Sequence, residues 1–209
     1  MEWSRNAAAA AVAFLAAAAA AQQAPVCEQD ASVTERFIPV ELLTGLPAPE
    51  KPELVFAPVR RSYPFVNVLP DGRLGGGEVT LEGPVRWTGE GGKDYEVYER
   101  KVPRAHERFA FTPDRTAIGR VYDERFGNAV NEGKFPVGLW QQGQKRSYAT
   151  VYGGSRRAVS SITIEKLSCT YEGVAGALQY RWTSNGLDYG YIYAPGRGVV
   201  QVMTYRSGR

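Results

Sequence analysis

The chain has 209 residues, of which 44% are hydrophobic and 22% are charged, and its formal net charge is +3. These values are ordinary for a globular protein, and so small a charge argues against nucleic acid or an anionic membrane surface as the main partner. Twelve Tyr, four Trp and 23 Gly against two Met favour strands and turns over helices. The length fits one β-rich domain, or one domain with a trailing arm.

The N-terminus has the pattern of a secretory signal peptide. Arg5 precedes an unbroken apolar run over residues 7–21, in which Ala dominates, and Gln22 and Gln23 end the run. A short basic region, an apolar stretch and small residues before a polar break are the marks of such a signal. A run this short and rich in Ala favours cleavage, with an uncleaved anchor as the alternative. We therefore expect a bacterial exported protein, periplasmic or secreted, with no transmembrane span once residues 1–21 are removed.

The two cysteines are expected to form a disulfide. Cys27 lies just after the expected cleavage site, and Cys169 lies in a predicted strand. In an oxidising compartment two cysteines most simply pair, and a bridge that closes so long a loop would stabilise the fold by roughly 4 kcal/mol. Two alternatives stay open: two free thiols, or a lipid on Cys27. Pro25 and Val26 argue against the lipid, because lipoprotein signals carry small residues at those positions.

Residues 22–62 are predicted to form a Pro-rich arm. Proline removes a backbone donor and restricts φ, so neither a long helix nor a central strand can pass through this segment. Leu42, Leu43 and Phe56 make the arm partly apolar, so we expect it to lie on the body as an extended cover of one sheet face. The prolines between residues 28 and 58 are Pro39, Pro47, Pro49, Pro52 and Pro58.

Short strands separated by turns are predicted between residues 63 and 123. Pro70, Asp71 and Gly72 form a turn sequence after a strand over residues 65–69. Pro84 interrupts a strand pattern over residues 77–87, which implies an edge position or a bulge. Residues 95–100 and 108–111 have further strand patterns, and residues 117–122 fit either a strand or the start of a short helix.

The clearest pattern lies in residues 140–205, which predict five consecutive strands joined by short turns. Leu178, Tyr180 and Trp182 alternate with polar residues, as expected of a strand with one buried face. Asn185-Gly186 fits a type I′ hairpin, because both positions require positive φ. The spacing of the strands and the short turns predict an antiparallel meander.

Three further details belong to this region. The apolar positions change phase between Ile164 and Leu167, which requires a bulge near Glu165 or Lys166 because the period of a strand is two. Residues 153–154, Gly-Gly, are predicted to form a turn. Residues 195–196, Pro-Gly, fit the central positions of a type II turn.

The end of the last hairpin carries a family resemblance. Tyr-Ala-Pro-Gly-Arg-Gly-Val-Val, residues 193–200, resembles the end of several families of uncharacterised bacterial exported proteins. In those families a similar aromatic-x-Ala-Pro-Gly-x-Gly-hydrophobic stretch ends a curved antiparallel sheet of the half-barrel type. The resemblance implies a fold and a compartment but no activity. We predict an all-β domain over residues 63–209, a single curved antiparallel sheet (meander, half-barrel or barrel-like), with an irregular Pro-rich N-terminal arm.

The sequence offers little for metal, cofactor or nucleophilic chemistry. His106 is the only histidine and lies in a polar stretch, so a His-rich metal site is excluded and catalysis by His106 is not expected. The two cysteines lack the close spacing of a redox or zinc pair. Residues 72–77 are glycine-rich but lack the Lys-Thr and helix of a phosphate loop. We predict no metal and no cofactor.

Carboxylate pairs keep an enzymatic alternative open. Two acidic side chains facing each other across a cleft can act as acid and base in a hydrolase. The candidate pairs are Asp123 with Glu124, Glu96 with Glu99, and Glu165 with Asp188.

The aromatic hairpin supplies the candidate ligand-binding residues. Tyr189, Tyr191 and Tyr193 share one strand face, near Arg181 and Trp182 on the neighbouring strand. Such a surface suits an apolar or carbohydrate ligand. The competing interpretation is that alternating aromatic residues simply pack across strands, and a covering arm tied to Cys169 favours it.

The predicted role is therefore a non-enzymatic binding or structural protein of the cell envelope. Its ligand would be hydrophobic or carbohydrate, or its partner another envelope protein. Two alternatives are a carboxylate-dependent hydrolase and an assembly subunit that pairs through strand edges without a ligand site.

Overall fold

The computed structural model describes residues 23–46, 58–103, 105–111, 118–124, 127–130, 135–152 and 156–206. The predicted signal segment and the predicted turn at residues 153–154 lie outside the described residues. Among the described helices, none has both the length and the apolar character needed to cross a membrane.

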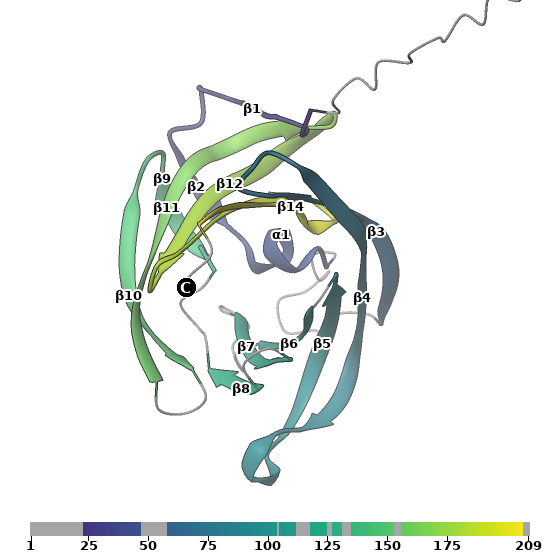
Figure 1. The fold of residues 1–209 in the computed structure, drawn as a ribbon. Coiled ribbons are helices and arrows are strands. Elements are labelled where there is room, and N and C mark those ends of the chain that lie inside the picture. Colours follow the sequence, from purple (N-terminus) through teal and green to yellow (C-terminus); the bar gives the residue numbers. More distant parts are fainter. Residues whose placement is uncertain are drawn as a thin grey trace, which may run out of the picture.

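The described residues form one large, mixed and mostly antiparallel sheet, which confirms the predicted all-β class and curved sheet. Its twelve strands run in the order β1-β11-β10-β8-β7-β6-β5-β4-β3-β14-β13-β12, and β12 also pairs with β11. Figure 1 shows the sheet curving around the helix α1. The strands are β1 (Cys27–Gln29), β3 (Val59–Val68), β4 (Leu74–Thr88), β5 (Asp94–Val102), β6 (Ala105–Phe111), β7 (Ile118–Asp123), β8 (Gly127–Val130), β10 (Lys145–Tyr152), β11 (Arg156–Tyr171), β12 (Val174–Ser184), β13 (Leu187–Ala194) and β14 (Gly198–Arg206).

Three further elements complete the described chain. Strands β2 and β9 pair with each other as a separate antiparallel ribbon. The helix α1 follows β2 directly, and a 3-10 helix joins β4 to β5. Their bounds are β2 (Glu35–Ile38), β9 (Gly138–Gln141), α1 (Val40–Thr44) and η1 (Glu90–Gly92).

The C-terminal meander is confirmed strand by strand. Strands β10 to β14 each pair antiparallel with the next. Asn185 and Gly186 have φ of 47° and 81°, the pair of positive values that a type I′ turn needs. At the next turn, the amide of Arg197 donates to the carbonyl of Ala194 at 3.1 Å and Gly196 has φ of 70°, as in a type II turn.

Both predicted bulges are present. The register between β11 and β12 shifts between Ile164 and Lys166, and again further along β11. The register between β4 and β5 shifts between Glu82 and Val85, where Pro84 interrupts the ladder. Each bulge lies where the sequence places a phase change or a proline in the middle of a strand.

Two features of the sheet go beyond the sequence prediction. Residues 118–123 form the strand β7, which decides between the strand and the helix left open for this region. Strand β3 begins at Val59, before the expected arm boundary at residue 63, and pairs in parallel with β14, with Gln201 opposite Val66. A parallel pair joins segments distant in sequence, so no local turn signal announces it.

Part of the arm, around α1, packs on the inner side of the curved sheet. Figure 1 shows α1 within the curve, and α1 contacts β13 and β14. Its apolar residues belong to one buried cluster with inner-face residues of the sheet, so the segment expected to be an extended cover packs here as a short helix. The cluster includes Ile38, Val40, Leu42, Leu43, Phe65, Val79, Phe109, Trp140, Ile162, Ile164, Leu178, Tyr180, Trp182 and Tyr193.

A close backbone approach fixes the end of α1. Gly45 ends the helix with φ of 70°, and its amide donates to the carbonyl of Glu41 at 2.8 Å. A Cβ at Gly45 would lie 2.5 Å from the carbonyl carbon of Arg197 and 2.6 Å from the amide of Gly198. The glycines of the Ala-Pro-Gly-Arg-Gly stretch therefore do more than turn the chain, because Gly198 lets the helix end reach the β13–β14 turn.

The predicted disulfide is present and belongs to a second, smaller core. Cys27 and Cys169 are bridged, with their Cα atoms 5.4 Å apart, and each is 1% exposed. Strand β1 pairs antiparallel with β11, with Gln29 opposite Cys169, so the bridge ties the start of the arm to the sheet. The buried residues of this core are Cys27, Cys169, Tyr171, Ala177, Ile192, Ala194 and Val200.

Candidate functional site

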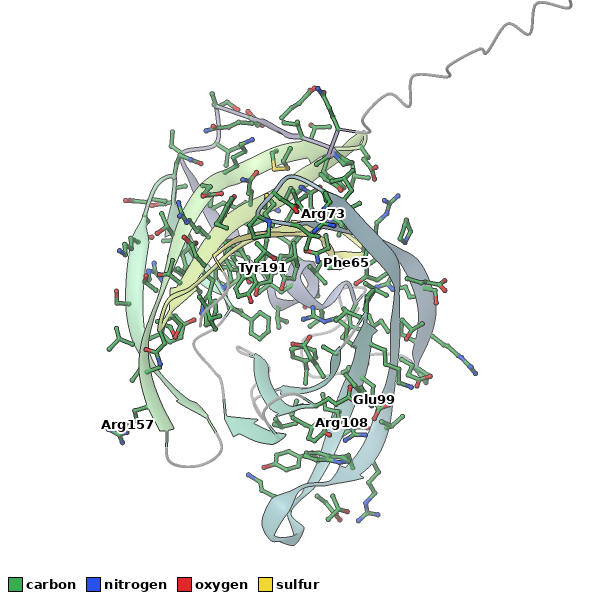
Figure 2. All side chains as sticks on the ribbon, viewed as in Figure 1. Phe65, Arg73, Glu99, Arg108, Arg157 and Tyr191 are labelled. Carbon is green, nitrogen blue, oxygen red and sulfur yellow. A yellow bond between two sulfur atoms is a disulfide. The ribbon has the colours of Figure 1, made fainter. Side chains whose placement is uncertain are left out.

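The aromatic residues proposed for ligand binding line the inner side of the sheet. Tyr191 and Tyr193 lie 5.3 and 5.7 Å, centroid to centroid, from Tyr180 on β12, and both rings stack on it. Trp182 stacks on Tyr189 at 6.2 Å and donates from its indole nitrogen to the hydroxyl of Tyr148 at 2.7 Å. Figure 2 shows Tyr191 and Phe65 within the space that the sheet encloses.

The arm covers much of this aromatic face. Tyr193 is 1% exposed and Trp182 is 4% exposed, and both pack in the cluster that holds Val40 and Leu43 of α1. Rings buried to this degree in the core leave no free surface for a ligand at those positions. The packing of Trp182 and Tyr193 therefore supports the structural interpretation of the hairpin over the ligand-binding one.

Arg181 is separated from the aromatic residues. It lies on the opposite face of β12 from Trp182, since neighbouring residues of a strand point to opposite sides. Its guanidinium bonds Asp188, with Nε 2.7 Å from Oδ1 and Nη2 2.5 Å from Oδ2, and it lies 4.8 Å from the ring centroid of Tyr205. The structure thus does not bring the five predicted residues into one site.

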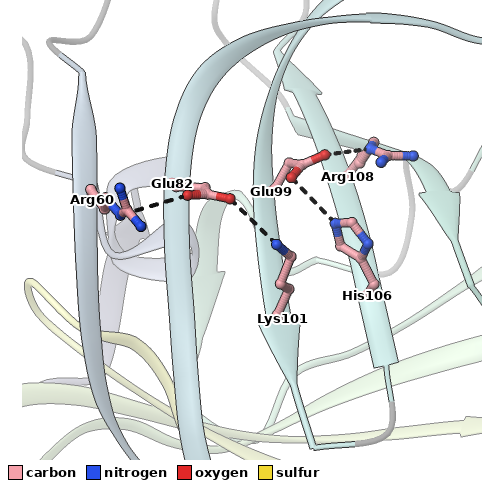
Figure 3. Close-up of polar contacts among 6 residues, drawn as sticks. All are labelled: Arg60, Glu82, Glu99, Lys101, His106 and Arg108. Carbon is pink, nitrogen blue, oxygen red and sulfur yellow. Dashed lines mark hydrogen bonds and ion pairs between the residues drawn. The ribbon is translucent and has the colours of Figure 1, made fainter.

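The histidine belongs to a charged network on the outer side of β3 to β6 (Figure 3). Glu99 joins two partners, with its carboxylate 2.7 Å from Nε of Arg108 and 3.5 Å from Nε2 of His106. Glu82 on β4 likewise joins two partners, with its carboxylate 3.4 Å from Nζ of Lys101 and 3.9 Å from Nε of Arg60. Opposite charges thus alternate across neighbouring strands.

Glu99 is held ionised in this network. Partial burial would raise its pKa, but the hydrogen bond and charge of Arg108 outweigh burial and hold the pKa below the ordinary value. Arg108 is itself enclosed by aromatic rings, 5.2 Å from the centroid of Trp87 and 4.8 Å from that of Tyr122. A carboxylate kept ionised by an arginine is a poor general acid, so the arrangement favours a structural network.

The other predicted carboxylates are similarly engaged or lie apart. Glu165 accepts a hydrogen bond from Nε2 of Gln179 at 2.7 Å, and Asp188 is bound by Arg181. Glu96 is exposed, and the side chain of Asp123 lies outside the described residues. Among the residues that the structure describes, no group of three or more His, Cys, Asp or Glu is arranged to hold a metal ion.

A cavity of about 480 Å³ lies on the outer face of β12 to β14. Gln179 and Ile192 line it, and each alternates along its strand with the inner-facing tyrosines, which places the cavity on the side away from α1. We call it the outer pocket. It is lined by Ala24, Pro25, Val26, Cys27, Val68, Leu69, Pro70, Gly72, Lys166, Gln179, Ile192, Gln201, Met203, Thr204 and Tyr205.

Three separate parts of the chain build the walls of the outer pocket. The residues just before the disulfide form one wall, so the Cys27–Cys169 bridge holds that wall on the sheet. The turn between β3 and β4 forms another, closed by a hydrogen bond from the amide of Gly72 to the carbonyl of Leu69 at 2.9 Å. The floor is the outer surface of β13 and β14, where Ile192 and Met203 pack beside the second core.

Lys166 is the one charged residue among those that line the outer pocket. It lies at the β11 bulge, is partly buried, and donates from Nζ to the carbonyl of Cys27 at 2.5 Å. Gln201 adds a second polar group, and its Oε1 accepts a hydrogen bond from the hydroxyl of Tyr171 at 3.0 Å. The pocket is therefore mostly apolar with a polar side.

Sequence reasoning missed the outer pocket entirely. The one local signal was the phase change near Lys166, which predicts the bulge where this lysine lies. Nothing in the sequence pattern places the β3–β4 turn beside β14, because that contact depends on the parallel pairing of β3 with β14.

Comparison of the chain with known protein families, curated proteins and solved structures finds no match. The function is therefore argued from the outer pocket, the disulfide and the packing of the arm.

Proposed function

We propose that this is an exported, non-enzymatic binding protein of the bacterial cell envelope, which holds an apolar ligand in the outer pocket. The volume of about 480 Å³ carries the proposal, because small-molecule sites commonly have 300–1,000 Å³ with mostly apolar linings and few polar groups. The aromatic hairpin contributes by forming the packed inner layer beneath the pocket floor.

Export is supported by two independent features. The first is the signal-like pattern of residues 1–21. The second is the buried Cys27–Cys169 bridge, since disulfides persist mainly in oxidising compartments. Mass spectrometry of the protein from a periplasmic fraction should show loss of the N-terminal segment and one disulfide; full-length protein with two free thiols would contradict export.

An apolar ligand is favoured over a carbohydrate by the lining. Ile192, Met203, Val68, Leu69 and Val26 contribute aliphatic or thioether surface. Sugars are usually held between exposed aromatic rings, whereas Tyr205 is the one ring among the lining residues and the rings of the β12–β13 hairpin are turned to the other face.

Binding of N-phenyl-1-naphthylamine, a neutral apolar fluorophore, tests the proposal. Its fluorescence should rise on binding to the mature, disulfide-bonded protein. Val68→Trp fills the pocket from the end of β3 and should weaken binding at least about tenfold, which corresponds to about 1.4 kcal/mol. Val159→Trp is the matched control, because Val159 is 73% exposed and does not line the pocket.

Near-UV circular dichroism of each variant checks that the fold is retained. Absence of binding by the wild-type protein would overturn the proposed function. Equal binding by Val68→Trp and Val159→Trp would show that the probe binds elsewhere, and would overturn the assignment to the outer pocket.

A further inference from the structure

The charge arrangement around the outer pocket is uneven. Arg181, on the same outer face of the sheet, is paired with Asp188 through two hydrogen bonds. Glu165 accepts a hydrogen bond from the neutral amide of Gln179 and keeps its negative charge on this side of the sheet. Lys166 pairs with no carboxylate among the residues that the structure describes, and its hydrogen-bond partner is the neutral carbonyl of Cys27. An ammonium has three donors, so this bond leaves two for other groups.

The place of Lys166 makes this charge available to a ligand. The ammonium is partly buried and bound to a wall of the pocket, so its position is set by Cys27 and by the bulge of β11. A charge that is partly removed from water and lacks a counter-ion favours the approach of an anion. Gln179 and Gln201 lie along the same lining, and the amide nitrogen of Gln179, which donates one hydrogen to Glu165, has a second hydrogen for another acceptor.

We propose that the ligand of the outer pocket is an anionic amphiphile, with its apolar body on Ile192 and Met203 and its anionic head group paired with Lys166. This inference rests on the proposed function and adds the charge and polarity of the ligand. A fatty-acid carboxylate and a lipid phosphate share this chemistry, and both are small enough groups to reach a single ammonium.

A matched pair of fluorophores tests the inference. 8-Anilino-1-naphthalenesulfonate has the skeleton of N-phenyl-1-naphthylamine plus a sulfonate, which stands in for the anionic head. The mature protein should bind the sulfonate at least about tenfold more tightly than the neutral probe. This ratio should fall as salt is added, since the ion pair is partly exposed.

Substitutions at Lys166 separate charge from packing. Lys166→Gln should abolish the preference, so that the ratio of the two affinities falls to about one, whereas Lys166→Arg should keep the preference. Lys145→Gln is the matched control, because Lys145 is exposed on β10 and does not line the pocket. Thermal unfolding of each variant shows whether losing the bond to Cys27 affects the fold.

The outcomes distinguish the two proposals. If wild-type protein binds neither probe, the proposed function fails. If it binds both equally, or if Lys166→Gln keeps the preference, the apolar pocket stands and the anionic ligand is overturned. Displacement of the sulfonate probe by decanoate or by decyl phosphate then identifies the head group, and displacement by neither would also overturn the inference.

Discussion

Arg100 on β5 lies opposite Glu107 on β6, and the two form a buried ion pair. Nη2 and Nε of Arg100 lie 2.6 and 3.0 Å from Oε2 of Glu107, and the side chains are 7% and 4% exposed. Burial would lower the pKa of Arg100, but the charge of Glu107, the hydrogen bond to it, and the nearby Tyr193 and Tyr63 together outweigh burial and raise the pKa above the ordinary value. The guanidinium also lies 4.7 Å from the ring centroid of Phe109. The inner face of the sheet therefore holds a pair of charges that depend on each other.

Glu107→Gln should strongly destabilise the protein. It leaves Arg100 charged and buried without a counter-ion, which typically costs about 3–5 kcal/mol. Urea unfolding followed by circular dichroism measures the change. Asp71→Asn is the control, because it breaks an exposed ion pair with Arg73 that water screens, and little change is expected there. A similar small effect for both variants would show that the buried pair carries little stability.

Removing the disulfide should lower stability and loosen the outer pocket together. The bridge joins residues 142 apart in sequence, and loss of a native bridge of this kind typically costs about 2–5 kcal/mol. The double variant Cys27→Ala/Cys169→Ala should show this loss in urea unfolding and should bind N-phenyl-1-naphthylamine more weakly. Unchanged probe affinity in a folded double variant would mean that the residues before Cys27 are not a functional wall.

Replacing two buried tyrosines by phenylalanine should change stability in opposite directions. The hydroxyl of Tyr63 is buried without a hydrogen-bond partner among the described residues, whereas the hydroxyl of Tyr171 donates to Gln201 at 3.0 Å. Tyr63→Phe should therefore leave stability unchanged or raise it by about 1 kcal/mol, and Tyr171→Phe should lower it by about 1 kcal/mol. Urea unfolding of the two variants under one condition measures the difference. Loss of stability in Tyr63→Phe would reveal a partner for that hydroxyl.

Stability should fall at alkaline pH. Burial raises the pKa of Tyr63 to about 12, against an ordinary value of 10. Between these values the folded state keeps a proton that the unfolded state has lost, so stability is complete below pH 10 and decreases as pH rises towards 12. Ultraviolet absorbance of the phenolate and unfolding midpoints from pH 9 upwards would measure this. Tyr63→Phe should show a shallower decrease, and an identical pH dependence would exclude Tyr63 as a contributor.

Gly45→Ala should separate α1 from the β13–β14 turn. The new Cβ adds strain at φ of 70° and meets the backbone of Arg197 at 2.5 Å. Left-handed strain of about 1–2 kcal/mol and overpacking of about 1–3 kcal/mol together predict a loss of about 2–5 kcal/mol. Gly72→Ala is the control, since its φ is 80° but its Cβ meets nothing within 4 Å. Gly72→Ala should therefore lose only the stability that the left-handed strain costs. Equal shifts of the unfolding temperature in the two variants would contradict the close approach of Gly45 to Arg197.

Much of the local structure could be predicted because its causes are local. Asn185-Gly186 and Pro195-Gly196 specify their turns through the φ values these residues tolerate, and the alternation of Leu178, Tyr180 and Trp182 specifies which face of β12 is buried. The two bulges follow from a phase change and a proline. The Cys27–Cys169 pairing was predictable because the signal pattern implies an oxidising compartment. In such a compartment the two cysteines of this chain most simply pair with each other.

The candidate site was less predictable. The sequence pattern grouped Arg181 with Trp182 and three tyrosines, since they are near one another along two strands. Alternation sends Arg181 to the face of Asp188 and Tyr205, and Tyr193 and Trp182 are buried in the core on the inner face. The sequence indicated no function for Lys166, because a lysine at a bulge has no functional meaning unless a cavity lies beside it, and the sequence pattern does not reveal that cavity.

The sequence by itself thus determined strands, turns, bulges and the disulfide, all of which depend on nearby residues or on pairing two unique groups. Tertiary structure alone decided that α1 packs on the inner face, that β3 joins β14 in parallel, and that the outer pocket forms beside Lys166. These depend on contacts between segments far apart in the chain. Such contacts are chosen by how well the buried faces pack together, which no local pattern of residues encodes.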